Sequence, residues 1–282
     1  MIEKKIFVWD ETFPSFVLKG EGTYAFLQGQ TTADIYAQEK LERTFLSCWL
    51  STKGVLKALL EIRLSNNMAE IVIISGEINS IRNGFESVIF PADKVKLEIE
   101  KPIRRIQKIS NYSSWKDLKS NLICSKDSIE NEISCLTKVS KEELAIWKLK
   151  QGIPSFDREI NGETNPYELG LGDIVKLDKG CYLGQEAIAR FVRSKFLKCK
   201  LYFWEAYGES NCFDIGKKFL NSNQDHLERK KVGVVTSSIK INDNFFCGLA
   251  LIKNNFINKD ICFSEKDESI TIKKPISFIQ TF

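Results

Sequence analysis

A single cysteine set between two glycines constrains this chain more than any other feature of its sequence. Residues 179–190 read KGCYLGQEAIAR, and Cys181 directly follows Gly180. Glycine adopts backbone conformations that other residues avoid, so Gly180 and Gly184 predict sharp turns on either side of the thiol. The residues from Gln185 onward favour a helix. Its free N–H groups would favour a thiolate or a bound anion at this place.

The chemistry of this segment centres on the Cys181 thiol. A nearby cation lowers the pKa of a thiol, and Lys179 stands two residues before the cysteine. Tyr182 offers a flat ring, and Gln185 and Glu186 offer an amide and a carboxylate. Taken alone, a Lys-Gly-Cys triplet is more often a buried cysteine in a strand-to-helix turn, with the glycines serving geometry only.

The length and composition predict a globular protein of two or three domains. The chain has 282 residues, of which 43% are hydrophobic and 28% charged. The net charge of +4 is too small to indicate nucleic-acid binding by itself. We find no apolar run near the roughly 18 residues that span a bilayer, and no signal-like N-terminal core. A cytoplasmic protein without membrane contact is therefore expected.

The cysteines and the single histidine exclude several kinds of site. Among eight cysteines the closest pair, Cys124 and Cys135, is 11 residues apart, so there is no CxxC motif. A disulfide framework, a zinc ribbon and a contiguous iron–sulfur ligand run are not expected. His226 lies in a polar stretch, which argues against a Cys-His catalytic pair.

Hydrophobic periodicity predicts an α+β layer in the first half of the chain. Residues 23–35 read as helical turns broken at Gly29, and residues 78–90 have helical spacing. Asn66 and Asn67 predict a hairpin turn. Strand patterns cover residues 44–50, 55–64, 70–75 and 94–100. We therefore expect helices on one face of an antiparallel sheet.

The second half predicts a capped helix, a long loop and a small barrel. Ser140 and Glu143 form a capping box that opens a helix ending before Gly152. Residues 153–172 form a long polar loop, which is typical of functional segments. Strand patterns then cover residues 197–206, 231–238, 245–252, 261–264 and 269–273. Short strands at this spacing predict a small antiparallel β-barrel at the C-terminus.

Several motifs, in the right order, resemble the YgfZ family of folate-binding proteins, which are related to the T-protein of the glycine cleavage system. The string at residues 179–190 is the specific match. Supporting matches lie at residues 26–34 (FLQGQTTAD), 52–54 (TKG), 148–154 (KLKQGIP), 165–168 (NPYE), 233–237 (GVVTS) and 248–252 (GLALI). The resemblance covers most of the chain.

The resemblance implies an α+β fold of three domains in a ring around a folate pocket. Two domains would be ferredoxin-like α+β layers and the third a small antiparallel β-barrel. The predicted folate-binding core is discontinuous and takes in residues 1–50 and 138–196. Residues 51–137 would form the second domain, and residues 197–282 the barrel.

The resemblance also implies a function and a set of site residues. Family members bind tetrahydrofolate and support iron–sulfur enzymes, including cluster-dependent tRNA-modifying ones, and Cys181 matches the cysteine that they need. Cys181 would ligate iron or sulfur transiently, or react with folate-derived formaldehyde; the sequence does not separate these, nor whether the protein is an enzyme. The predicted contacts with tetrahydrofolate are Asp34, Lys53, Tyr182, Gln185, Glu186 and Arg190.

Two alternatives to this accessory role remain open. One is a tetrahydrofolate-dependent one-carbon transferase or demethylase, for which Asp34, Glu168 and Glu186 are the candidate acids. T-proteins carry an acidic pair where this chain has Lys57 and Ala58, which argues against aminomethyl transfer. The other is a tRNA-binding module that uses a basic stretch, although alternation favours the solvated face of a strand. That stretch consists of Arg190, Arg193, Lys195, Lys198 and Lys200.

Overall fold

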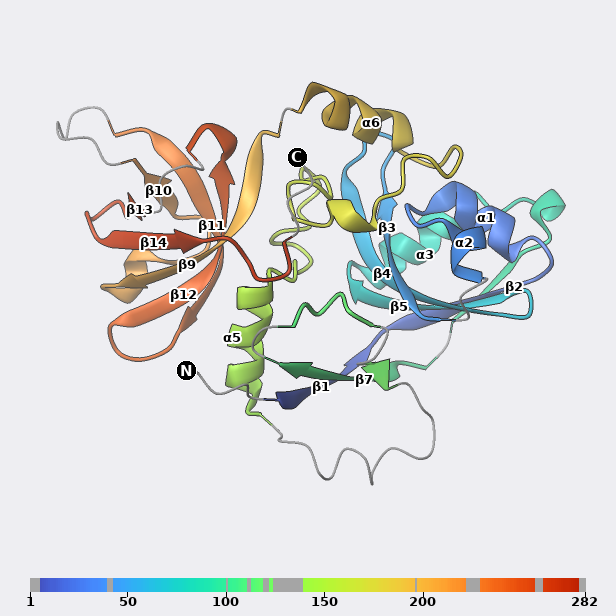
Figure 1. The fold of residues 1–282 in the computed structure, drawn as a ribbon, viewed down its shortest axis with the longest axis horizontal. Helices are drawn as coiled ribbons and strands as arrows, with labels where there is room; N and C mark the ends of the chain where they lie inside the picture. The colour runs from blue at the N-terminus through green and yellow to red at the C-terminus, as the bar shows by residue number, and fades with distance from the viewer. Residues whose placement is uncertain are drawn as a thin grey trace. The chain divides into compact units, whose positions relative to one another are not determined.

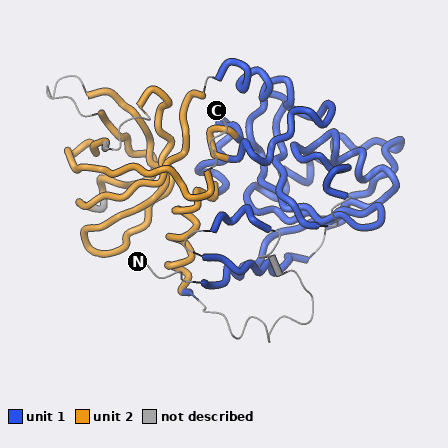
Figure 2. Tube along the Cα trace, in the orientation of Figure 1, with its two compact units in different colours: residues 1–139, 155–166, 171–195 blue, residues 140–154, 167–170, 196–282 orange. Residues whose placement is uncertain are grey.

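The computed structural model describes residues 6–39, 43–99, 101–110, 113–118, 122–123, 139–195, 197–221, 229–256 and 261–278. Cys124, Cys135 and His226 lie outside these residues. The chain divides into two compact units, each assembled from separate stretches of sequence (Figure 2). The first unit takes in residues 1–139, 155–166 and 171–195, and the second takes in residues 140–154, 167–170 and 196–282. Within the described stretches, every helix is too short or too polar to cross a bilayer.

The first unit is built on a five-stranded antiparallel sheet with the strand order β3-β4-β5-β2-β6 (Figure 1). Asn66 and Asn67 join β4 to β5 as a two-residue hairpin, both with positive φ, as their sequence predicts. The strands are β2 (Ser15–Lys19), β3 (Phe45–Leu50), β4 (Leu56–Ser65), β5 (Met68–Ser75) and β6 (Lys96–Ile99).

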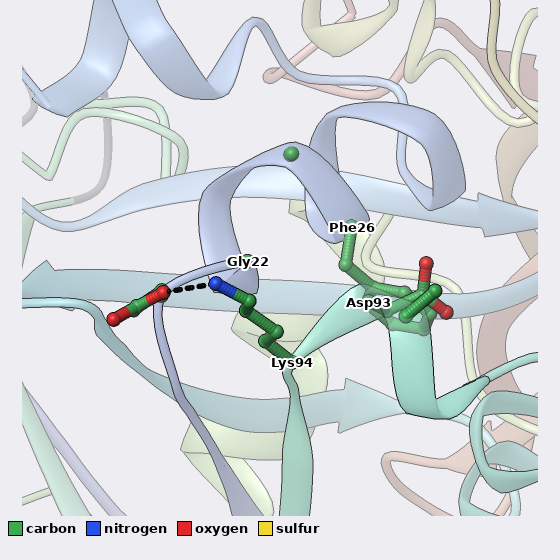
Figure 3. Close-up of a pocket in the computed structure, with 7 residues that line it drawn as sticks. Gly22, Phe26, Asp93 and Lys94 are labelled. Carbon is green, nitrogen blue, oxygen red and sulfur yellow. Dashed lines mark hydrogen bonds and ion pairs between the residues drawn. The ribbon is translucent and has the colours of Figure 1, made fainter.

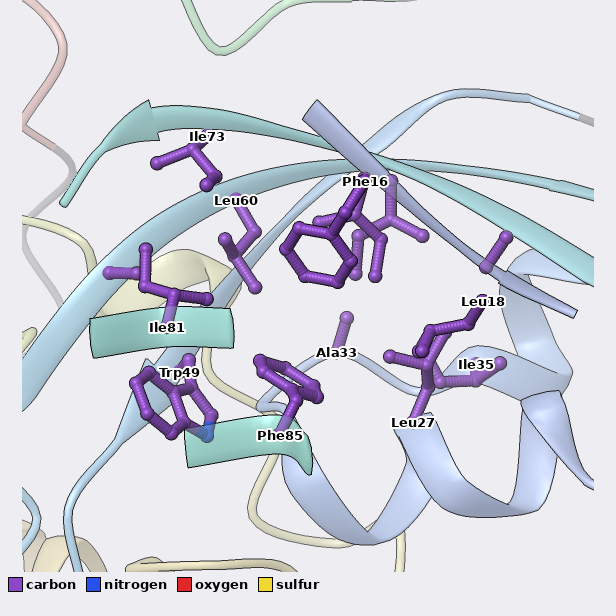
Figure 4. Packing of buried hydrophobic residues seen from close by; sticks show 14 of the residues in the cluster. Phe16, Leu18, Leu27, Ala33, Ile35, Trp49, Leu60, Ile73, Ile81 and Phe85 are labelled. Atoms are coloured by element: carbon purple, nitrogen blue, oxygen red, sulfur yellow. The ribbon is translucent and has the colours of Figure 1, made fainter. Parts of the chain in front are cut away.

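Helices α1 (Thr23–Gln30), α2 (Ile35–Glu39) and α3 (Ile78–Glu86) pack on one face of this sheet, and the hydrophobic core lies between (Figure 4). Phe85 lies at its centre, with its ring centroid 5.2 Å from that of Trp49 and 5.5 Å from that of Phe16. Gly84 is required beside it, because a β-carbon there would lie 2.2 Å from the Trp49 ring. The predicted layer of helices on one sheet face is confirmed.

A second sheet of the same unit was not predicted. It has the order β1-β7-β8, formed by β1 (Ile6–Phe13), β7 (Ile103–Ser110) and β8 (Leu122–Ile123). Arg105 on β7 is 1% exposed and donates to Glu61 on β4, 2% exposed, across 2.8 Å. The Arg105 guanidinium also stacks on the Trp9 ring, 4.4 Å from its centroid. Burial raises the pKa of Glu61, and Arg105 opposes that rise.

The second unit contains a closed barrel with the order β10-β11-β12-β9-β14-β13. Its core is apolar, with the Trp204 ring tilted against that of Phe213 and edge-on to that of Phe219. The strands are β9 (Cys199–Tyr207), β10 (Lys218–Leu220), β11 (Lys231–Lys240), β12 (Phe245–Lys253), β13 (Ile261–Phe263) and β14 (Ser269–Lys273). The predicted C-terminal antiparallel barrel is confirmed, and β10 is the strand that the pattern missed.

Helix α5 (Lys141–Gln151), also in the second unit, forms as predicted. Ser140 and Glu143 cap it reciprocally, and Gly152 ends it with a left-handed φ of 70°. The predicted break of the first helix at Gly29 is wrong, because α1 continues through Gly29 to Gln30. The chain leaves α1 at Thr31, whose hydroxyl and N–H both bond to the Leu27 carbonyl. The predicted three-domain boundaries remain a prediction.

Candidate functional site

The cysteine segment lies in the first unit, between a short 3-10 helix (Gly172–Ile174) and α6 (Gln185–Ser194). Main-chain contacts fix its path. The N–H of Lys176 donates to the Thr32 carbonyl, and the N–H of Leu183 donates to the Gly29 carbonyl, each over 3.0 Å. The Gln185 side chain donates to the Leu177 carbonyl over 2.8 Å. Residues 176–185 are therefore tied to α1, to the residues after it and to α6.

A buried lysine anchors the start of this segment. The Lys116 ammonium donates to the Asp173 carboxylate over 2.6 Å, and the two side chains are 7% and 20% exposed. Burial lowers the pKa of Lys116, and the Asp173 charge opposes that shift. The loop that carries Lys116 is itself held by Gln107 on β7, whose amide donates to the carbonyls of Trp115 and Asp117.

Two glycines explain where α6 begins. Gly184 has a φ of 80°, and a β-carbon on it would lie 2.4 Å from the Ser51 carbonyl oxygen. Gly54 has a φ of 74°, and a β-carbon on it would lie 3.1 Å from the β-carbon of Ala187. The N-terminus of α6 thus packs on the turn between β3 and β4 with no room for side chains. The predicted helix start at Gln185 is confirmed.

Cys181 presents its thiol to solvent. Among the cysteines that the structure describes, it is the exposed one, Cys199 is half-buried and the others are buried. Burial raises the pKa of Cys48 to about 12 and that of Cys247 to about 11. Gly180 before the thiol has a φ of 97°, and a β-carbon there would meet nothing within 4 Å. A reaction partner can therefore approach Cys181 across an uncovered stretch of backbone.

The Lys179 side chain packs against the protein surface at Gln28 and Tyr182. Its ammonium donates to the Gln28 carbonyl over 2.5 Å and lies 4.8 Å from the centroid of the Tyr182 ring. Burial lowers the pKa of Lys179 to about 8, and the Asp34 carboxylate opposes this shift. Lys179 is thus an amine with a lowered pKa two residues from an exposed cysteine, and groups with shifted pKa values are typical of functional sites.

Three of the predicted folate contacts help to hold the segment itself. Asp34 accepts from the Gln28 amide and from the Ala37 N–H, each over 3.3 Å. Tyr182 is 7% exposed, with its ring beside the Lys179 ammonium. The Gln185 amide bonds to the loop. Tyr182 and Gln185 thus contact the cysteine segment directly, and Asp34 contacts Gln28, which bonds to Lys179.

The other three predicted contacts are exposed and available. Lys53 lies in the turn on which α6 packs. Glu186 and Arg190 pair along α6 over 3.2 Å, with side chains 86% and 75% exposed, so the pair costs little to open. A carboxylate suits the amino groups of a pterin, and two cations suit the carboxylates of a glutamate tail. Side chains of both kinds are therefore exposed on α6 and on the turn against which it packs.

A hollow of about 420 Å³ lies elsewhere in the first unit, at the start of α1 (Figure 3). The Lys94 ammonium reaches across to Glu21 over 2.7 Å. The lining residues are Glu21, Gly22, Ala25, Phe26, Ala92, Asp93 and Lys94. None of the predicted site residues is among them.

The acids weighed for transferase chemistry have other roles. Glu168, in the second unit, is 5% exposed and accepts from the Lys198 N–H over 3.2 Å. Ala58 is fully buried in the core, and Lys57 beside it is exposed, so this strand offers no acid where T-proteins have theirs. Sequence reasoning missed Gln28, Lys116 and Asp173, because their partners are distant in the chain.

Comparison with known proteins supports the resemblance. Two proteins from strains of Aliivibrio fischeri, each named tRNA-modifying protein YgfZ, are similar to this chain. One is 26% identical over 62% of this chain and 55% of its own length. The other is 24% identical over 95% of this chain and 94% of its own length. An aminomethyltransferase from Caldanaerobacter subterraneus is 30% identical over 39% of this chain and 27% of its own length. No protein-family model matches the chain.

A solved structure shares the fold. The glycine cleavage system aminomethyltransferase T from Bartonella henselae aligns with a TM-score of 0.70 over 98% of this chain and 87% of its own, at 13% identity. The resemblance to YgfZ proteins is therefore confirmed by curated homologues of that name. The T-protein-like mixed α/β fold with a C-terminal barrel is confirmed as well.

Proposed function

We propose that this protein is a folate-binding accessory protein that supports the assembly or repair of iron–sulfur clusters in client enzymes, including tRNA-modifying ones. The observation that carries the proposal is the exposed Cys181 thiol on a segment fixed on both sides by hydrogen bonds. A solvated thiol can meet a macromolecular client, whereas buried thiols such as that of Cys48 cannot. The tRNA-modifying name of the relatives points to the client class.

Tetrahydrofolate is the cofactor that we propose, and Lys53, Glu186 and Arg190 are the side chains that would hold it. Glu186 would accept from the pterin, and the two cations would bind the glutamate tail. The bound folate would supply a one-carbon unit or an acceptor for one. Cys181 would keep its thiol accessible for transient ligation of iron or sulfur, or for capture of folate-derived formaldehyde.

A one-carbon transferase or demethylase is supported less well. General acid–base catalysis needs a carboxylate that can reach the reacting nitrogen. Asp34 is engaged with Gln28 and the start of α2, and Glu168 is buried against the Lys198 N–H. Glu186, the third candidate, is 86% exposed and pairs with Arg190, so solvent surrounds its carboxylate. Direct binding of tRNA is also supported less well, because the Glu186 carboxylate partly neutralises the basic face of α6.

The deciding experiment replaces the thiol in a deletion strain of a bacterium that carries a homologue. We expect Cys181→Ser to abolish rescue of a cluster-dependent tRNA-modifying activity, while the protein folds and accumulates normally. Cys199→Ser, at a half-buried cysteine, is the matched control and should rescue fully. Full rescue by Cys181→Ser would remove the thiol from the mechanism.

A second experiment tests the cofactor separately. Tryptophan fluorescence should change on titration of the purified protein with tetrahydrofolate. The double variant Lys53→Ala/Arg190→Ala should bind at least tenfold more weakly, whereas Lys57→Ala should bind like the unaltered protein. Equal affinity in all three proteins would contradict the proposed folate contacts.

A further inference from the structure

We propose that Gln28 on α1 is the positioning residue of the Cys181 segment. We define the α1 clamp as the contacts of Gln28 and Gly29 with Lys179 and Leu183. In this proposal the clamp keeps the thiol presented to its reaction partner. The functional meaning of the clamp rests on the proposed role of Cys181, but its geometry can be tested independently.

The contact between Gln28 and Lys179 is reciprocal. The Gln28 side-chain amide donates to the Lys179 carbonyl over 2.8 Å, and the Lys179 ammonium donates to the Gln28 carbonyl over 2.5 Å. Each residue thus uses its side chain on the backbone of the other. Displacement of the Lys179 backbone would break the bond from the Gln28 amide and pull the ammonium from the Gln28 carbonyl, so the pair fixes the direction in which the chain enters the cysteine turn.

The chemistry of an amide is needed at position 28. The Gln28 side-chain oxygen accepts from the Ile35 N–H over 2.7 Å, and this sets which end of the amide faces Lys179. Its nitrogen also lies 3.3 Å from the Asp34 carboxylate. Gln28 therefore accepts from one side and donates to two acceptors on the other. A carboxylate or an apolar side chain of the same length cannot do this.

The clamp holds the chain on either side of Cys181 in sequence. Lys179 precedes the thiol by two residues, and Leu183 follows it by two and donates to the Gly29 carbonyl over 3.0 Å. Gly180 between them has a φ of 97° and no neighbour within 4 Å of the place of a β-carbon. Because no side chain or backbone among the described residues packs at this place, we attribute the shape of the turn to hydrogen bonds: those from α1, together with that of the Gln185 amide to the Leu177 carbonyl.

The Lys179 ammonium reports on the state of the clamp. It is partly buried against Gln28 and the Tyr182 ring, and this burial lowers its pKa to about 8. Opening of the clamp would return the ammonium to water, where a lysine titrates near 10.5. A loss of general stability, with the clamp still closed, would leave this titration in place.

The experiment follows the Lys179 side chain by NMR in the full-length protein, with the signal assigned through Lys179→Met. In Gln28→Met we expect the pKa of Lys179 to rise from about 8 toward 10.5, while the circular dichroism spectrum stays unchanged. Gln30→Met, at a half-buried residue of the same helix, should leave the pKa of Lys179 at about 8. If Gln28→Met does not fold, Gln28→Asn, with an amide one methylene too short, should give the same rise. An unchanged titration in either folded variant would overturn the clamp.

A genetic readout then separates the clamp from the proposed function. Gln28→Met should lose most of the rescue in the deletion strain, and Gln30→Met should keep it. If Cys181→Ser rescues fully, the proposed function fails while the NMR titration still decides the clamp. If the titration moves but Gln28→Met rescues fully, the clamp exists without positioning the thiol for function, and the proposal is wrong in that respect.

Discussion

The guanidinium of Arg105 donates to the carboxylate of Glu61 over 2.8 Å, and both side chains are almost completely buried between β7 and β4. Removal of one charge leaves the other buried without an opposite charge beside it. We therefore expect Glu61→Gln to lower the free energy of unfolding by about 3–5 kcal/mol, measured by urea denaturation. The double variant Glu61→Leu/Arg105→Met should recover most of that loss.

A matched control for this prediction lies one residue away on the same strand. Arg104 pairs with Asp10 over 2.6 Å, but these side chains are 54% and 30% exposed. Asp10→Asn should cost less than about 1 kcal/mol, because solvent screens the pair. Equal losses in Glu61→Gln and Asp10→Asn would show that burial does not decide the strength of these pairs here.

Alanine substitutions at two glycines with nearly the same φ should separate the cost of backbone strain from the cost of steric crowding. Gly184 has a φ of 80° and Gly162 a φ of 82°. A β-carbon on Gly184 would lie 2.4 Å from the Ser51 carbonyl, whereas on Gly162 it would meet nothing within 4 Å. Gly162→Ala should cost only the left-handed strain, about 1–2 kcal/mol. Gly184→Ala should cost a further ~1–3 kcal/mol from overpacking in urea denaturation.

Thiol accessibility should follow burial. Iodoacetamide at neutral pH should modify Cys181 in the folded protein, while Cys48 and Cys247 should react only in denaturant, because they are buried and burial raises the pKa of each thiol. Mass spectrometry of the digested protein measures each site. Early modification of Cys48 under native conditions would contradict the structure.

Lys179 should make stability depend on pH above neutrality. Its pKa is about 8 in the folded protein against an ordinary 10.5, so between these values the unfolded chain binds more protons. Stability should therefore rise as the pH increases from 8 to 10.5. The gain should be about 1–2 kcal/mol after solvent screening of this partly exposed amine.

Urea denaturation at several pH values gives that slope directly. Other lysines, cysteines and tyrosines titrate in the same range, so the comparison is made with Lys179→Met. The slope in this variant should be smaller by the contribution of Lys179. A slope that does not differ between the two proteins would mean that the ammonium is solvated in the native state.

The parts of the fold that the sequence predicted are those with a local physical cause. Asn66 and Asn67 tolerate positive φ and gave the hairpin, and Ser140 with Glu143 gave the start of α5. Strands β1 and β7 were not predicted, because their burial depends on contacts between residues that are distant in the chain. Arg105 reads as a solvated residue in a periodicity pattern, and only its distant partner Glu61 makes its burial possible.

The same distinction applies to the candidate site. The glycines around Cys181 indicated the turns and the start of α6, because backbone conformation is a local property. The residues that hold the segment could not be found in this way. Lys116 meets Asp173, 57 residues later, and Gln28 meets Lys179, 151 residues later. No periodicity or capping rule spans such separations.

The separation between Gln28 and Lys179 in sequence also determines when their contact can form during translation. A ribosome that adds about 5–20 residues per second completes Gln28 roughly 8–30 s before it reaches Lys179. During that interval the helix bearing Gln28 can form, but the amide N–H that later donates to the Lys179 carbonyl must bond to water. The nascent chain therefore acquires its presented thiol late, after the sheet beneath α1 has already been translated.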